Sequence, residues 1–178
     1  IDDWSLTADN AITLTGDVRV AAGGKITHFG NSTSETYRLN LTVLGNLTID
    51  AGGTVNADAL GYPGGAGPGA SLTDYTGGSH GGRGFNISRD TYGSVTAPTN
   101  LGCGGSYYGI AGGGAVRLTT YGTTTVNGVV SALGDSRHNN AAGAGGSVDL
   151  TTGPRLGGGR ISVNRRTGGG GGGGGGRI

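Results

Sequence analysis

Residues that could carry out chemistry are few in this sequence and are spread along it. Cleavage of a polysaccharide needs clustered carboxylates, which hold calcium or act as an acid and base pair, plus a basic residue near the scissile bond. Glu35 is the only glutamate, and the aspartates beyond the first ten residues share no recurring position: Asp17, Asp50, Asp58, Asp74, Asp90, Asp135 and Asp149. We therefore predict no catalytic site and expect that the protein is not an enzyme.

The histidines and the single cysteine form no metal-binding pattern. His28, His80 and His138 lie in different segments without ligand spacing, so neither a metal nor a cofactor is predicted. Cys103 has no second cysteine in this chain and makes no internal disulfide. It is either buried in its "LGCGGS" turn or available to another chain, and we expect burial.

Four asparagines lie in N-x-Ser/Thr sequons, the acceptor pattern for N-linked glycans: Asn31, Asn40, Asn46 and Asn86. Asn40 and Asn46 alternate with apolar neighbours and should point outward from strands, so glycans there would leave the core intact. The sequons predict glycosylation of these four residues in a eukaryotic secretory pathway.

Tyrosines gather in one long glycine-rich segment, residues 58–112. Five of the seven lie there, with Arg83 among them: Tyr62, Tyr75, Tyr92, Tyr107 and Tyr108. Tyrosine among glycines gives a flat amphipathic surface that suits stacking on sugars or contact with another subunit, which makes these residues a candidate ligand patch. The alternative is that the rings cover a glycine-lined sheet that has few other side chains to bury.

Composition and charge exclude two classes of partner. Glycine supplies 44 of 178 residues, and 12 Lys and Arg against 11 Asp and Glu give a net charge of +1. The basic residues are scattered, so no nucleic-acid partner is predicted. Membrane insertion is not predicted either, because no apolar run approaches the roughly 18 to 20 residues that span a bilayer. The opening "IDDWSLTADN" lacks a signal layout, so we expect a mature product or a piece of a longer chain.

An internal repeat of about 31 residues supplies the elements that must position these side chains. Gly-Gly-x-Ile/Val occurs six times, from "GGKI" at Gly23 to "GGRI" at Gly175. Apolar residues alternate with a period of two within each unit, which predicts short strands with one buried face. The inward positions so predicted are Ile12, Leu14, Val18, Val20, Ile26, Leu39, Leu41, Val43, Leu47, Ile49, Val55, Val116, Leu118, Val126, Val129, Val148, Leu150, Ile161 and Val163.

Units of this size cannot close a core alone, but stacked coils share one. We therefore predict an all-β fold, a parallel β-solenoid and specifically a right-handed β-helix, with about four coils and the start of a fifth. It forms a single domain over residues 1–178. Residues 1–57 are the first two coils, 58–112 are an insertion rich in Gly and Tyr, and 113–178 are the later coils with their glycine-rich loops.

The nine glycines of "RTGGGGGGGGGRI" at the end of the sequence are expected to form a loop that leaves the stack and returns, so that Arg177 and Ile178 begin the next strand. The glycine-rich loops are either irregular or packed on one another as extended threefold polyglycine helices. Their missing side chains would permit close Cα–H···O contacts in the second arrangement.

The order of these blocks resembles a known architecture. "LTVLGNLTIDAGGTVNADALGYPGGAGPGAS", "GGSHGGRG", "APTNLGCGGS" and "GGGAVRLTTYGTTTVNGVVSALGDS" are similar to the glycine-rich β-helix repeats of very large extracellular and cell-surface proteins of bacteria and some protists. The resemblance covers the chain from Asn40 onward and implies an adhesin-like or structural role.

Two functional hypotheses remain ahead of a third, a polysaccharide lyase or hydrolase. The leading one is a structural extracellular or cell-surface module that stacks head to tail with copies of itself into a fibre, filament or sheath. Its expected contact residues lie near both ends of the solenoid: Trp4, Ile12, Leu14, Val18, Val20, Ile161, Val163 and Ile178. The alternative is an adhesin module that binds extracellular glycans through the tyrosine-rich insertion.

Overall fold

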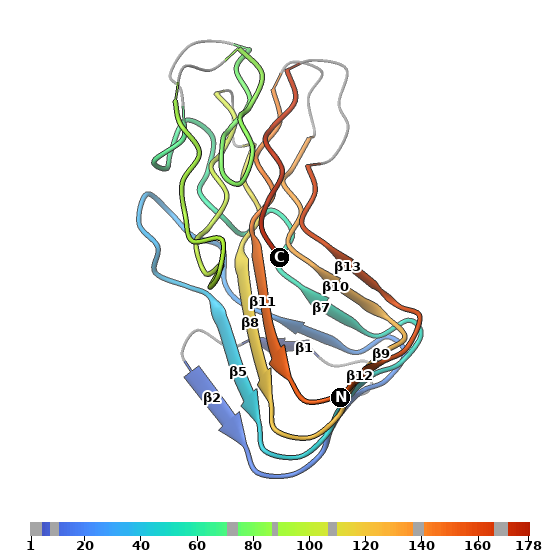
Figure 1. Ribbon diagram of the computed structural model, residues 1–178. Coiled ribbons are helices and arrows are strands. Elements are labelled where there is room, and N and C mark those ends of the chain that lie inside the picture. Colours follow the sequence, from blue (N-terminus) through green and yellow to red (C-terminus); the bar gives the residue numbers. More distant parts are fainter. Residues whose placement is uncertain are drawn as a thin grey trace.

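Thirteen strands form three parallel sheets in the described part of the computed structural model, and no helix occurs there (Figure 1). The structure describes residues 5–7, 11–70, 75–86, 89–106, 110–136, 141–165 and 171–178. Sheet A contains β1 (Ser5–Thr7), β4 (Lys25–Thr27), β7 (Thr54–Asn56), β10 (Val129–Ser131) and β13 (Arg160–Ser162). Sheet B contains β2 (Ala11–Leu14), β5 (Leu39–Val43), β8 (Ala115–Thr120) and β11 (Ser147–Thr152). Sheet C contains β3 (Val18–Val20), β6 (Leu47–Ile49), β9 (Thr124–Val126) and β12 (Arg155–Leu156).

Each sheet takes every third strand of the chain. In sheet B, for example, β2 pairs with β5, β5 with β8, and β8 with β11, all in parallel. The chain therefore passes through the three sheets in turn and repeats the circuit one strand spacing further along. This order confirms the all-β fold of parallel strands and is the order of a parallel β-solenoid.

Apolar side chains at equivalent positions lie over one another inside the three sheets. One inward column contains Ile12, Leu41, Leu118 and Leu150, and another contains Ile26, Val55, Val130 and Ile161. Most of the predicted inward residues belong to this core. Burial of each such side chain contributes about 1.5–3 kcal/mol, so the shared core compensates for strands of only a few residues.

One predicted inward position was wrong. Val130, rather than Val129, is buried, because Val130 pairs with Val55 and Ile161 in the inward column. Val129 pairs with Thr54 and Arg160 on the outer face. In "NGVVS" the two adjacent valines fit a period of two in either phase, so the alternation alone does not choose between them.

Strand-free segments of the chain run side by side beyond the sheets, in the upper part of Figure 1. We call the packed residues 61–70, 75–85, 101–105, 110–114, 132–135, 141–146 and 171–176 the glycine bundle. Residues 57–106 and 110–114 contain no strand among their described positions, and they supply most of the bundle.

Hydrogen bonds in the glycine bundle have a period of three residues. The N–H groups of Ala142, Gly143 and Ala144 donate to Gly171 O, Asp135 O and Cys103 O at 2.9, 3.0 and 2.9 Å. The N–H groups of Gly145 and Gly146 then return to the first two neighbours, at Gly174 O (3.0 Å) and Ala132 O (2.8 Å). A flat sheet gives a segment two neighbours, whereas three directions repeating every third residue are those of a threefold extended helix. These bonds support the packed threefold arrangement for residues 142–146, whereas residues 61–70 include local turns.

Candidate functional site

The outermost strands β11, β12 and β13 form one end of the solenoid, which we call the β11 end. Leu150 of β11 and Ile161 of β13 are only partly buried there, although both lie in inward columns. They line a pocket of about 280 Å³ together with Val95, Pro98 and Ile178. Ile178 is 65% exposed and Val95 71%. The β11 end therefore leaves apolar core side chains accessible to a partner.

Backbone pairing already extends past β11 at one point. Arg177 forms a parallel bridge with Ser147, and Val148 N–H donates to Arg177 O at 3.0 Å. This bridge places Ile178 beside the start of β11, as expected of a residue that begins the next strand. Within the described residues, β11 has no other backbone partner on that edge, so the rest of the edge is open to a further strand.

At the opposite end, β1, β2 and β3 are outermost, and we call it the β2 end. Ile12 and Leu14 of β2 are partly buried, and β1 lies on β4 with its Leu6 against the core. Trp4, which was expected to cover this edge, falls outside the described residues. Ile12 and Leu150 thus occupy the two ends of the same inward column.

Three of the predicted contact residues have buried side chains. Val18, Val20 and Val163 are 8%, 0% and 6% exposed. Val18 and Val20 lie on the outermost strand β3, so that strand could meet a second molecule through its backbone edge but not through these side chains. Ile12, Leu14, Ile161 and Ile178 retain accessible surface and remain candidates.

The tyrosine patch is also corrected. Tyr62 is 7% exposed, and Tyr92 is partly buried against the glycine bundle, with its hydroxyl on Leu101 O and 3.1 Å from Cys103 Sγ. The Tyr62 ring is therefore not available for a sugar to stack on, and the Tyr92 ring is accessible only in part. Tyr75 is 57% exposed, and Arg83 forms an exposed ion pair with Asp90 at 2.6 Å. Tyr107 and Tyr108 lie outside the described residues.

The surroundings of Tyr62 and Cys103 raise the pKa of both side chains. Burial and the neighbouring Glu35 raise the pKa of Tyr62 to about 12. Burial also raises the pKa of the Cys103 thiol, which is fully buried as expected and accepts a hydrogen bond from Gly69 N–H at 3.0 Å. A protonated, enclosed thiol is a poor nucleophile, so Cys103 is a packing residue in this fold.

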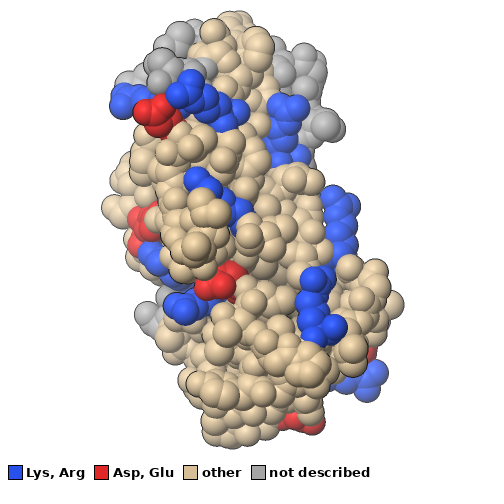
Figure 2. All heavy atoms as spheres, in the orientation of Figure 1, with Lys and Arg blue, Asp and Glu red and all other residues tan. Residues whose placement is uncertain are grey.

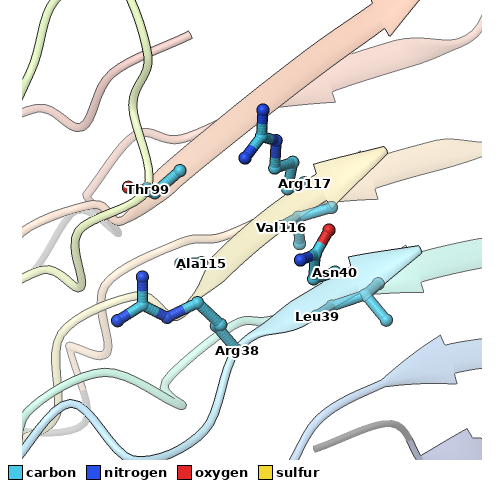
Figure 3. A pocket seen from close by; sticks show the side chains of 7 residues that line it. All are labelled: Arg38, Leu39, Asn40, Thr99, Ala115, Val116 and Arg117. Carbon is cyan, nitrogen blue, oxygen red and sulfur yellow. The ribbon is translucent and has the colours of Figure 1, made fainter. Parts of the chain in front are cut away.

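A smaller pocket, of about 120 Å³, lies on the outer face of sheet B (Figure 3). Leu39 and Asn40 of β5, Ala115, Val116 and Arg117 of β8, the preceding Arg38, and Thr99 of the insertion line it. Arg38 is held by Glu35 at 3.2 Å and Arg117 by Asp149 at 3.3 Å. We call this the arginine pocket.

Sequence reasoning missed the arginine pocket. Arg117 and Asn40 are a registered pair on β8 and β5, so aligned repeats would have placed them side by side. Thr99 comes from the insertion, whose path over the sheet has no repeat to align. The sequence therefore contained a signal for the part of the pocket formed by the sheet, but none for the part formed by Thr99.

The sequon asparagines differ in how strongly the fold engages them. Asn31 donates from Nδ2 to Tyr37 O (2.8 Å) and Leu60 O (2.9 Å), and its Oδ1 accepts from Thr36 N–H and Tyr37 N–H. A glycan on Asn31 would replace one of the two Nδ2 hydrogens, which argues against modification there. Asn46 accepts from Thr123 N–H at 2.9 Å, Asn40 lines the arginine pocket, and Asn86 is exposed in a loop.

The described residues contain no group of three or more His, Cys, Asp or Glu side chains placed to hold a metal ion. Nor do they include a helix with the length and hydrophobicity needed to cross a membrane. Figure 2 shows Lys and Arg scattered over one face of the molecule, without a continuous basic surface.

Comparison of the chain with models of protein families, with curated proteins and with solved structures found no match.

Proposed function

We propose that the protein is a structural extracellular module that stacks head to tail with copies of itself into a cell-surface fibre, filament or sheath. Its scaffold is a right-handed β-helix of about four coils with the start of a fifth. The observation that carries the proposal is the partly open core at the β11 end, where Leu150 and Ile161 border a pocket of about 280 Å³.

The chemistry of the two ends supports a second copy as the partner. Ile12 of β2 and Leu150 of β11 lie in one inward column, so β2 of one copy placed on β11 of the next would continue that column. Both edges consist of parallel strands, which present the same backbone spacing to an incoming strand. A contact between two different ends of identical molecules is heterologous and generates an open filament when its rotation does not close a ring.

Electron microscopy of native protein over a dilution series tests the proposal. We expect regular filaments that shorten on dilution, with an axial rise of four or five strand spacings of about 4.8 Å each. The resemblance to glycine-rich repeats of extracellular proteins supports the location. Monodisperse particles at every concentration would contradict head-to-tail assembly.

A further inference from the structure

We propose that the arginine pocket binds the carboxylate of an acidic sugar in an extracellular polysaccharide. This site shares no lining residue with the pocket at the β11 end, and none of the tyrosines of the insertion lines it. The inference does not depend on assembly, because a single chain contains the whole pocket.

The charge of the lining favours an anion. Arg38 and Arg117 both line the pocket, and no acidic residue does. Guanidinium groups suit carboxylates because their N–H donors match the two oxygens in a plane. Each arginine is paired with an acidic neighbour outside the lining, and a ligand carboxylate would bind the donors that these pairs leave accessible.

Both guanidinium groups keep donors for a ligand. Arg38 uses Nη2 to bind Glu35, and Arg117 uses Nε to bind Asp149. Neither arginine makes a further hydrogen bond to the described part of the chain. The side chains of Arg38 and Arg117 are 40% and 48% exposed, so a ligand carboxylate can reach the other donors.

The two ion pairs also position the arginines before a ligand arrives. Glu35 accepts hydrogen bonds from Asn100 Nδ2 and Leu101 N–H, both at 3.3 Å, so the partner of Arg38 is itself fixed. Asp149 stands on β11 in register with Arg117 of β8. Because the arginine side chains are already ordered, less side-chain entropy is lost when a ligand binds.

The remaining polar groups fit a sugar better than a bare ion. Asn40 on the sheet and Thr99 on the insertion both line the pocket, and they add an amide and a hydroxyl to it (Figure 3). These groups donate to and accept from the hydroxyls next to the carboxylate of a uronic acid. The pocket lies over β5 and β8, the two inner strands of sheet B.

Isothermal titration with a glucuronate-containing tetrasaccharide from hyaluronan tests this assignment. Protein made in a bacterial host is used, so that Asn40 carries no glycan. We expect the tetrasaccharide to bind at least about tenfold more tightly than its carboxyl-reduced form, and Arg38→Gln or Arg117→Gln to weaken it about tenfold or more. Binding should weaken as NaCl is raised, because the contact is ionic.

Arg19→Gln is the matched control. Arg19 of β3 is exposed, forms an ion pair with Asp50 at 2.7 Å and lies outside the pocket. Asn40→Asp is a second test that keeps both arginines, and its added negative charge should also abolish binding. Equal affinity for the acid and the reduced sugar would overturn the proposal, as would equal losses in the Arg19 and Arg117 variants. Sodium sulfate or acetate binding as tightly as the tetrasaccharide would show a simple anion site and overturn the sugar assignment.

Discussion

His80 is a fully buried titratable side chain of the glycine bundle. Its Nδ1 donates to Gly145 O at 2.8 Å, and its ring packs against Tyr92 with centroids 4.9 Å apart. Nε2 is buried and has no hydrogen-bond partner among the described residues. The neutral ring fits this site, whereas protonation would place a second N–H without an acceptor in the interior.

Stability should therefore fall in acid because of His80. Burial lowers its pKa below the ordinary 6.5, so the unfolded state binds the proton more readily than the folded state. As the pH falls below about 6.5, the free energy of unfolding should decrease by up to about 1.4 kcal/mol per pH unit until the folded pKa is reached. Urea unfolding between pH 7.5 and 4.5 measures this, with His80→Asn as reference because its amide can still donate to Gly145 O. Identical pH slopes in both proteins would exclude His80 as the cause.

The packing of the nine-glycine run can be tested by substitution, because two adjacent glycines in it have different surroundings. A Cβ on Gly174 would overlap the carbonyl oxygen of Gly82, whereas a Cβ on Gly175 would meet nothing within 4 Å. Gly174→Ala should cost about 2 kcal/mol or more, since backbone atoms cannot move aside cheaply. Gly175→Ala should be neutral or stabilising by about 0.5 kcal/mol, because it restricts the unfolded chain. Thermal unfolding of the two variants measures the difference, and equal destabilisation would mean that the run is not packed as described.

The strands were more predictable from the sequence than the bundle that extends from them. The period-two alternation placed Ile12, Leu41 and Leu118 correctly, because inward positions in a solenoid must repeat in every coil. It failed at Val129 and Val130, where two adjacent valines satisfy either phase. In the glycine bundle the residues that matter have no side chains, so no hydrophobic pattern records which segments touch.

Candidate site residues on the repeated strands were likewise more predictable than those in the glycine-rich insertion. Ile12 and Ile161 could be assigned to the ends because coil order follows from the repeat, whereas Leu150 was predicted only as an inward position. The tyrosines could not be assigned, since the sequence shows that Tyr62 and Tyr92 lie among glycines but not that Tyr62 is buried and Tyr92 partly buried against the bundle. Thr99 reaches the arginine pocket through a path with no regular secondary structure, which only the folded chain reveals.

For the whole molecule, end-to-end stacking and sugar binding would reinforce each other. The arginine pocket lies on the inner strands β5 and β8, away from both ends, so a stacked copy need not cover it. A filament would then repeat one weak acidic-sugar site per copy along its length. Many linked weak sites hold a polymer far more firmly than one, because every contact after the first is intramolecular.

The stacking interface itself can be tested with one matched pair of substitutions. Leu150→Lys places an amine at the open core of the β11 end, where it can reach water in a free molecule but would be buried by a stacked copy. Leu44→Lys makes the same change at a position that is 46% exposed and follows the inner strand β5. We expect Leu150→Lys to raise the concentration needed for filaments at least about tenfold, which corresponds to about 1.4 kcal/mol per contact, while Leu44→Lys leaves it unchanged. Light scattering over a concentration series gives this threshold, and thermal unfolding confirms that each variant is folded.

If Leu150→Lys lowers stability, Ile178→Asp at the same end provides a second test, because Ile178 is already exposed. Filaments that form equally well with a charge at either β11-end position would place the contact elsewhere on the molecule.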